Sequence, residues 1–202
     1  MNLLPDNIYK KIYMYIFTDE EQRENKNSDE RIRRCASHFI CTEKKTNIKI
    51  PEIYRQDNEK PRFVTDIELC FSVSHSGKYW VCAVSGQQIG VDIQKKSNEY
   101  KQDIAERFFH PDEYQYLIQN NFKDFFDVWT AKESCVKYTG QGIGNDFSAF
   151  SVVKDNRIFE YINGVRIKFI PINLDYCLCI CAKDIDEKNI NVIIDPLLPT
   201  IA

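Results

Sequence analysis

Hydrophobic and polar positions alternate along the chain in patterns that predict a mixture of strands and helices. Strand-like runs, rich in β-branched and aromatic residues, occupy residues 8–17, 78–85, 88–94, 147–154, 157–162, 164–170 and 175–182. Helical patterns occupy residues 28–41, 99–109, 111–119 and 123–138, and a long loop is expected over about 42–70. No clear pattern continues beyond Asp184.

Turn residues indicate how some of these elements connect. The strands at 78–85 and 88–94 are predicted to form a hairpin around Ser85-Gly86-Gln87. Asn163-Gly164 is a strong hairpin signal and Asp155-Asn156 a weaker one. The glycine-rich run from Gly140 to Gly144 follows a helix instead of joining a strand to one, so helix termination explains it better than nucleotide binding.

Two pairs of similar segments suggest an internal duplication. Phe17–Glu21 is similar in type to Phe109–Glu113, and Tyr79–Ser85 resembles Tyr176–Ala182. Chance similarity between short apolar segments explains these stretches equally well. With duplication, the fold class would be α+β, with two similar halves at residues 1–95 and 96–202, each carrying helices over a small antiparallel sheet.

Composition and charge narrow the class of protein. Hydrophobic residues make up 43% and charged residues 28% of the 202 residues, so we expect a substantial core and no extensive disorder. The net charge of −3 argues against a nucleic-acid binder that needs a basic face. The apolar run Ile12–Phe17 is too short to span a bilayer and lacks a small-residue cleavage site. We therefore expect a cytoplasmic protein without membrane contact.

Eight cysteines raise the question of disulfides or structural zinc. No C-x-x-C pair exists, and none of the three histidines forms a ligand cluster with the cysteines. Cys177, Cys179 and Cys181 alternate and would share one face of a strand. We interpret the thiols as small buried hydrophobic groups in a reducing compartment.

One predicted helix carries a face suited to phosphate or metal chemistry. Trp129, Glu133 and Lys137 recur every four residues, so they stack along one side of the helix. Taken alone, an exposed Glu–Lys pair beside a buried tryptophan is the commoner explanation.

Two further segments add polar groups. In the strand Ile89–Gln94, Asp92 and Gln94 project to one face, where a carboxylate suits a hard cation such as Mg²⁺. Ser72–Gly77, expected as a loop, offers hydroxyls and the imidazole of His75 to phosphate oxygens. An ordinary strand-end aspartate and an ordinary polar turn are the alternatives.

The order of these segments resembles the 4′-phosphopantetheinyl transferase superfamily. Between about Lys60 and Gly144 the chain has a Ser-His segment, a Gly-Val-Asp strand, Phe-Phe-x-Pro-x-Glu, and Trp-x-x-Lys-Glu-Ser-x-x-Lys. The length and the two-half organisation are similar to the larger, surfactin-synthetase-activating type. The combination is far more specific than any of its parts.

The resemblance implies a fold and an activity. Such proteins form a pseudo-twofold pair of α+β halves and bind coenzyme A in the cleft between them. They transfer its 4′-phosphopantetheine group to a serine of an apo acyl or peptidyl carrier protein and release 3′,5′-adenosine bisphosphate. They require Mg²⁺. Nothing in the sequence selects among fatty-acid, polyketide and nonribosomal-peptide carriers, and we expect a monomer.

The resemblance also implies roles for single residues. Asp92 and Glu133 would bind Mg²⁺, Lys137 would contact the pyrophosphate, and Glu133 would help deprotonate the carrier serine. Ser74 and His75 would hold the 3′-phosphate of coenzyme A or groups near it.

Two basic positions complete the implied coenzyme A site. Lys60 resembles an adenine- or phosphate-contacting position. An arginine of residues 31–34, best assigned as Arg33, would add a phosphate contact, although a solvated basic helix face explains that cluster equally well.

One departure from the family pattern concerns the third metal ligand. Many surfactin-type members have a glutamate where this chain has Gln94, which offers a carbonyl oxygen but no negative charge. A non-catalytic relative that binds coenzyme A or a carrier protein with a degraded metal site is therefore the main alternative. Another Mg²⁺-dependent phosphoryl enzyme is a further alternative, which no residue favours.

Overall fold

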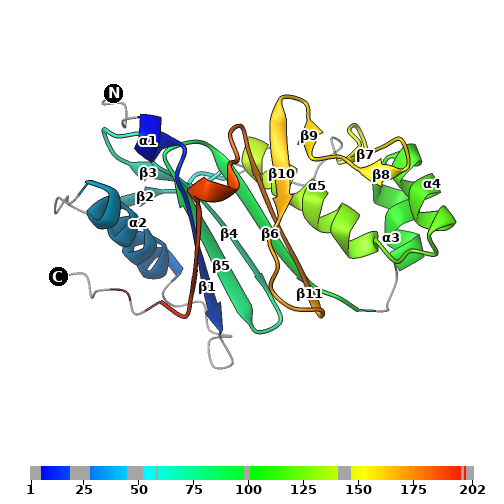
Figure 1. Cartoon of the computed structure of the whole chain (residues 1–202), viewed down its shortest axis with the longest axis horizontal. Helices are drawn as coiled ribbons and strands as arrows, with labels where there is room; N and C mark the ends of the chain where they lie inside the picture. Colours follow the sequence, from blue (N-terminus) through cyan, green and yellow to red (C-terminus); the bar gives the residue numbers. More distant parts are fainter. Residues whose placement is uncertain are drawn as a thin grey trace.

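The computed structural model describes residues 6–18, 28–44, 52–57, 59–97, 101–140, 147–196 and 198. Two four-stranded sheets lie at the centre, with long helices on either side (Figure 1). The helices are α1 (Asp6–Tyr9), α2 (Ser28–Lys44), α3 (Lys101–Phe108), α4 (Pro111–Gln119), α5 (Phe125–Thr139) and the 3₁₀ turn η1 (Glu187–Asn189). The strands are β1 (Ile12–Thr18), β2 (Glu52–Tyr54), β3 (Arg62–Val64), β4 (Cys70–Ser76), β5 (Tyr79–Ser85), β6 (Ile89–Lys95), β7 (Val153–Lys154), β8 (Arg157–Ile158), β9 (Tyr161–Ile162), β10 (Val165–Phe169), β11 (Tyr176–Ala182) and β12 (Ile190–Ile194).

The first sheet has the order β12-β1-β5-β4 and packs against α2. Side chains alternate along β1. Tyr13 and Tyr15 therefore join the core under α2, while Ile12, Met14 and Ile16 face the opposite side of the sheet. β1 pairs antiparallel with β5 and parallel with β12. The parallel pairing brings the end of the described chain back beside its beginning.

The second sheet has the order β6-β11-β10-β9 and packs against α5. All seven residues of β11 are buried, as expected for a strand covered on both faces. Cys179 and Cys181 lie in the core under α5, and Cys177 donates to Asp127 of the same helix, whereas Leu178 and Ile180 lie in the core between the sheets. The shared face predicted for the three alternating cysteines is therefore confirmed. All eight cysteines are free thiols, and six of them are buried.

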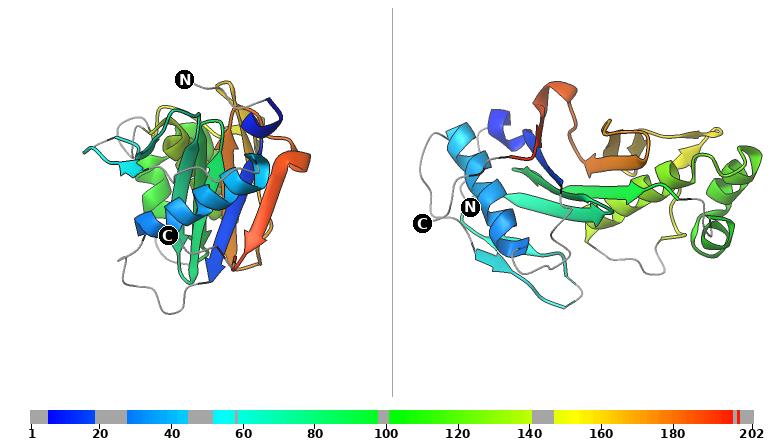
Figure 2. Two further views of the ribbon diagram at one scale, coloured as in Figure 1. Left: turned by 90° about the vertical axis from the view of Figure 1, so that its left-hand side faces the viewer. Right: turned by 90° about the horizontal axis from the view of Figure 1, so that it is seen from below.

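A third hydrophobic cluster joins the two sheets. It combines Met14 of β1 and Val81 of β5 with Val91 of β6 and Ile180 of β11. The right-hand view in Figure 2 shows α2 at one end of the molecule and α3 and α4 at the other, with the two sheets and α5 between them. Through this cluster the two sheets pack on each other and share a hydrophobic core.

The structure confirms the mixed α+β class and most of the predicted elements, with several corrections. The strand predicted over 147–154 is confined to β7, the strand predicted over 157–162 is divided into β8 and β9, and residues 8–9 of the strand predicted over 8–17 belong to α1. The expected hairpin between 78–85 and 88–94 is wrong, because β5 already pairs with β1 and β4 while β6 pairs with β11 in the other sheet. The expected loop over 42–70 contains β2 and β3, which pair with each other. The segment beyond Asp184, without a clear pattern in the sequence, forms η1 and β12.

The two sheets do not correspond to the two sequence halves, 1–95 and 96–202. β6 lies in the first half but pairs with β11, and β12 lies in the second half but pairs with β1. The backbone pairings therefore cross between the two sequence halves in both directions.

Both hairpin signals of the C-terminal part are confirmed. Asn163 and Gly164 have φ of 48° and 84° between β9 and β10, and Asp155 and Asn156 have φ of 52° and 58° between β7 and β8. Gly140 ends α5 in the left-handed conformation at φ 80°, as predicted, while residues 141–146 lie outside the described residues.

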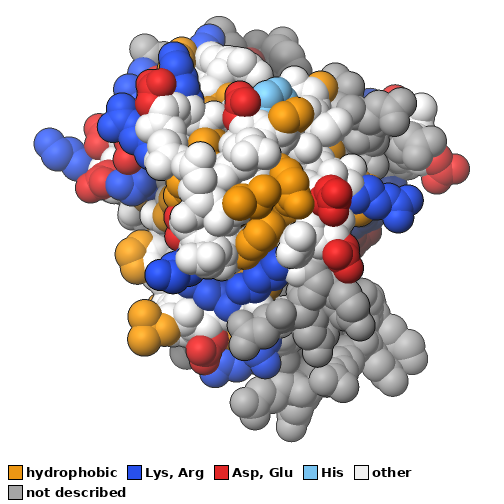
Figure 3. All heavy atoms as spheres, turned by 90° about the vertical axis from the view of Figure 1, so that its right-hand side faces the viewer, with side chains coloured by type: hydrophobic (Ala, Val, Ile, Leu, Met, Phe, Trp, Pro, Cys, Tyr) orange, Lys and Arg blue, Asp and Glu red, His pale blue; other side chains and the backbone are white. Residues whose placement is uncertain are grey.

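The α3–α4 end of the molecule carries exposed hydrophobic side chains. Figure 3 looks onto this end and shows hydrophobic side chains gathered in the middle of the face, with Lys and Arg side chains below them. Phe108 of α3 and Ile118 of α4 are among the exposed large hydrophobic residues. Within the described part of the chain, no helix combines the length and the apolar character needed to cross a bilayer.

Candidate functional site

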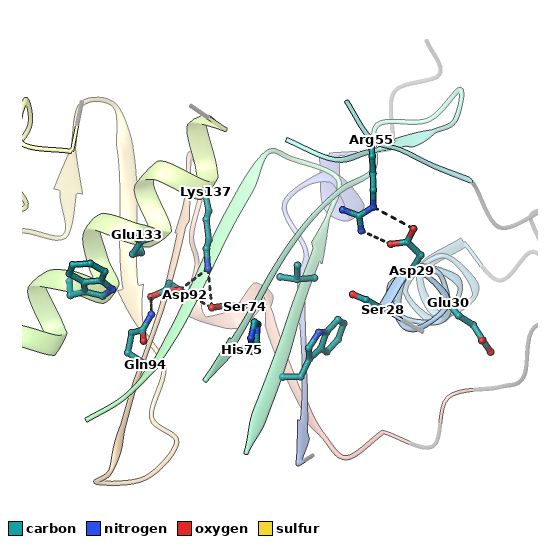
Figure 4. A pocket seen from close by; sticks show the side chains of 13 residues that line it. Ser28, Asp29, Glu30, Arg55, Ser74, His75, Asp92, Gln94, Glu133 and Lys137 are labelled. Atoms are coloured by element: carbon teal, nitrogen blue, oxygen red, sulfur yellow. Dashed lines mark hydrogen bonds and ion pairs between the residues drawn. The ribbon is translucent and has the colours of Figure 1, made fainter. Parts of the chain in front are cut away.

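A cavity of about 690 Å³ lies between the N-terminus of α2 and the inner face of α5, a size typical of small-molecule sites (Figure 4). One end is formed by α5, β6 and β4, and the other by α2 and the segment after β2. The described lining residues are Ser28, Asp29, Glu30, Arg55, Val73, Ser74, His75, Trp80, Asp92, Gln94, Trp129, Glu133 and Lys137.

Asp92 is the most deeply placed acidic residue of the cavity, with 1% of its side chain exposed. Its Oδ1 accepts hydrogen bonds from Lys137 Nζ at 2.7 Å and from Ser74 Oγ at 2.7 Å. Its Oδ2 accepts one from the side-chain amide of Gln94 at 3.1 Å. A buried carboxylate is costly without partners, and here a cation and two neutral donors supply them.

Lys137 of α5 bridges β6 and β4 through contacts with Asp92 and Ser74. Its ammonium group lies 2.7 Å from Asp92 and 2.9 Å from Ser74 Oγ, and its side chain is 30% exposed. It therefore keeps contact with the cavity while it neutralises a buried charge.

The helix face predicted from the four-residue spacing exists. Trp129, Glu133 and Lys137 all line the cavity from α5. This face can lie close to β6 because Gly90 has no side chain, and a Cβ there would overlap the carbonyl oxygen of Ser134.

Glu133 is buried, and its carboxyl group has a pKa near neutral pH. Burial, reinforced by the nearby Asp92 and opposed by Lys137, raises its pKa to about 7. Its Oε1 is buried and has no hydrogen-bond partner among the described residues. A carboxyl group that lines a cavity and has an unpartnered oxygen is suited to bind a cation or to accept a proton.

The Ser-His segment is a strand and not the expected loop. Ser74 and His75 lie in β4, so Ser74 points inward toward Asp92 while His75 is exposed at the mouth of the cavity. The alternation of Ser72, Ser74 and Ser76 was the signal for this strand, since a period of two places all three on one face.

Lys60 and Arg33 do not belong to the described lining. The Lys60 ammonium donates to the carbonyl oxygen of Ile89, and burial lowers its pKa to about 8. Arg31 lies closer to the site, because its guanidinium group stacks on Trp80, a lining residue, at 4.8 Å from the ring centroid.

The sequence did not predict the end of the cavity that is formed by α2 and the segment after β2. Arg55 forms an ion pair with Asp29 there, next to the first residues of α2. No sequence signal marks Arg55, because it lies in the stretch expected to be a loop.

The donor set fits a hard divalent cation with an incomplete protein shell. Asp92 and Glu133 face one cavity, and Gln94, whose amide nitrogen donates to Asp92, adds an amide oxygen to the lining. Among the residues that the structure describes, no group of three or more His, Cys, Asp or Glu side chains could hold a metal ion. Asp92 and Glu133 are the two carboxylates at this end of the cavity, while Asp29 and Glu30 lie at the end formed by α2.

The comparisons with known proteins agree with this chemistry. The family model described as the 4′-phosphopantetheinyl transferase superfamily matches residues 88–188. The chain is 37% identical over 113 residues to the 4′-phosphopantetheinyl transferase gsp of Aneurinibacillus migulanus, covering 54% of this chain and 47% of the relative. It is 36% identical over 142 residues to a 4′-phosphopantetheinyl transferase of Bacillus subtilis, covering 65% and 62%. It is 37% identical over 86 residues to the 4′-phosphopantetheinyl transferase Sfp of Bacillus subtilis strain 168, covering 41% and 38%. The chain thus spans between about two fifths and three fifths of the length of these relatives.

Proposed function

The chain belongs to the 4′-phosphopantetheinyl transferase superfamily, and we propose that it transfers the 4′-phosphopantetheine group of coenzyme A to a serine of an apo acyl or peptidyl carrier protein. The reaction forms a bond between the serine oxygen and the β-phosphorus of coenzyme A and breaks the bond from that phosphorus to the bridging oxygen. The serine loses its proton, and 3′,5′-adenosine bisphosphate leaves with the electron pair.

The observation that carries the proposal is the convergence of Asp92, Glu133, Lys137 and Ser74 in one cavity from three separate elements. Phosphoryl transfer needs positive charge at the phosphate oxygens and a base near the attacking hydroxyl. Lys137 supplies a cation that already sits between a carboxylate and a hydroxyl.

Glu133 is the residue best suited to accept the serine proton. In the metal-free protein the pKa of Glu133 is raised to about 7, so its carboxylate is a stronger base than that of an ordinary glutamate; a bound Mg²⁺ would lower this pKa. Its side chain lines the cavity, so the carboxyl group would receive that proton directly or through a water molecule.

Mg²⁺ is part of the proposal, and Asp92 and Glu133 would hold it, with the amide oxygen of Gln94 as a third donor. When bound, Mg²⁺ would supply positive charge that stabilises the developing charge on the phosphate oxygens. The unpartnered oxygen of Glu133 supports this assignment.

Coenzyme A would extend along the cavity from the reactive end toward α2. Ser74 and His75 are proposed to bind its phosphate groups from β4, and Lys137 its pyrophosphate. Arg31 on Trp80 is better placed than Arg33 to assist, and Lys60 would first have to leave the Ile89 carbonyl.

We also propose that two similar α+β halves form this cavity, each a four-stranded sheet with one long helix. The support is the shared plan of α2 on the first sheet and α5 on the second. The exchange of β6 and β12 between the sheets would then link the halves.

The mass of an apo carrier protein tests the proposal directly. Incubation with the chain, coenzyme A and Mg²⁺ should add one phosphopantetheine to the carrier. A Glu133→Gln variant should lose turnover by on the order of 10²-fold or more while remaining folded. Glu187→Gln is the matched control, because Glu187 is exposed on η1 and pairs with Lys168 outside the cavity lining. A panel of carriers without any mass shift, under conditions where a relative modifies them, would refute the activity.

The pairing of Gln94 with Asp92 favours one competing function, a non-catalytic protein that binds coenzyme A or a carrier. Calorimetry separates the two. Coenzyme A binding that is tight, insensitive to Mg²⁺ and unaccompanied by turnover would support the binding protein. Binding strengthened by Mg²⁺ would support the transferase.

A further inference from the structure

The two sheets meet at an unusual junction beside Asp92. β4 is the edge strand of the first sheet and β6 the edge strand of the second. Each has its only described backbone ladder on the opposite side, β4 with β5 and β6 with β11. Edge strands present unpaired backbone groups, and those of β6 must find partners because this strand is largely buried.

Serine hydroxyls of β4 fill that role. The Val91 N–H donates to Ser72 Oγ at 3.0 Å, the Ile93 N–H to Ser74 Oγ at 3.2 Å, and the Lys95 N–H to Ser76 Oγ at 2.9 Å. We call the three acceptors, Ser72, Ser74 and Ser76, the serine ladder. Both strands advance by two residues per contact, so the ladder repeats with the period of a strand.

The ladder holds the backbone on both sides of Asp92. Val91 and Ile93, which flank it, are each fixed by one hydroxyl. On the helix side, Gly90 lets β6 lie against the backbone of α5 next to Ser134. β6 is therefore held between the serine ladder and the helix that carries Glu133 and Lys137.

We propose that Ser72 is a positioning residue for the transfer reaction, an inference that rests on the proposed function. Ser72 is buried, is absent from the described cavity lining, and acts through Val91 to set where Asp92 stands relative to Lys137 and Glu133. Catalytic groups must be held to within about 0.5 Å, and a misplacement of about 1 Å can cost roughly 10²-fold in rate.

Three substitutions at buried strand serines test this assignment. Ser72→Ala should lower kcat by about tenfold or more and leave the KM for coenzyme A within about threefold, because catalytic groups and not substrate contacts are displaced. Ser72→Thr keeps the acceptor oxygen and should restore kcat. Ser85→Ala is the matched control, since Ser85 is also buried, in β5, and its hydroxyl donates to the carbonyl oxygen of Lys11 and accepts from the Gln87 N–H instead of joining the ladder.

Amide hydrogen exchange gives a readout that does not need turnover. Ser72→Ala should reduce protection of the Val91 amide, and Ser85→Ala should not. Full kcat in Ser72→Ala, or a folded Ser72→Thr variant that stays as slow as Ser72→Ala, would overturn the positioning role. If the wild type has no turnover, the proposed transferase activity fails and the positioning role falls with it, while the exchange data still decide whether the ladder exists.

Discussion

The buried pair of Lys132 and Glu113 offers a prediction about stability that is independent of catalysis. Both side chains are fully buried, and Lys132 Nζ lies 2.9 Å from Glu113 Oε2 and 3.1 Å from Oε1. The ammonium also donates to the Phe150 carbonyl oxygen at 2.6 Å. The Glu113 carboxylate accepts from the backbone N–H of Val152 at 2.8 Å and of His110 at 2.9 Å. The pair thus ties α4 and α5 to the segment before β7.

Replacing Lys132 by Met removes the countercharge and leaves a hydrogen-bonded carboxylate buried in the α5 core. Breaking a buried ion pair in this way costs about 3–5 kcal/mol, a large fraction of the ~5–15 kcal/mol that keeps a domain folded. Burial already raises the pKa of Glu113 and Lys132 opposes that rise, so in Lys132→Met the pKa should rise further.

The loss of stability in Lys132→Met should depend on pH. A carboxyl with a raised pKa in the folded state contributes stability at low pH and loses it as pH rises through that pKa. The cost of Lys132→Met should therefore be smaller at pH 5 than at pH 8.

Urea unfolding followed by tryptophan fluorescence measures the cost, and Trp129 reports locally because its ring lies 5.5 Å from that of Phe147 in the same core. The double variant Glu113→Gln/Lys132→Met removes both charges and keeps an acceptor for Val152, so it should be at least about 2 kcal/mol more stable than Lys132→Met. The reasoning is wrong if Lys132→Met costs less than about 1 kcal/mol, or if the two single costs simply add in the double variant.

Three further predictions concern the site. In metal-free protein, the raised pKa of Glu133 should make the free energy of unfolding fall as pH rises through about 7, and Glu133→Gln should abolish that step in urea titrations at pH 6 and 8. Gly90→Ala should destabilise the protein by roughly 1–3 kcal/mol, because the new methyl group meets the Ser134 carbonyl; an unchanged thermal midpoint would contradict this packing. Gln94→Glu should tighten Mg²⁺ binding by on the order of tenfold in calorimetry, since it adds a charged oxygen donor beside Asp92; weaker binding would place residue 94 outside the metal shell.

Periodicity and turn chemistry in the sequence were sufficient for the long helices, the C-terminal hairpins and the long strands other than β4. Helical spacing alone placed Trp129, Glu133 and Lys137 on one face, because 3.6 residues per turn leave no other arrangement for a helix. Asn163-Gly164 forms its hairpin because both positions need positive φ, which these residues adopt at low cost. The order of the motifs was enough to identify the superfamily to which the family model assigns the chain.

Only the tertiary structure decided which strands pair and which side chains meet. Proximity in sequence predicted a hairpin of β5 and β6, but a strand has two edges, and those of β5 were taken by β1 and β4. The contact of Asp92 with Ser74 and Lys137 joins residues up to 63 positions apart, and no local pattern encodes such a distance. The cation for a buried carboxylate can come from any element that packs nearby, so the Lys137 pairing became visible only once β4, β6 and α5 were placed together. What the sequence determined by itself was the face that each residue occupies within its own element; which faces share a core, and therefore a site, was decided by packing.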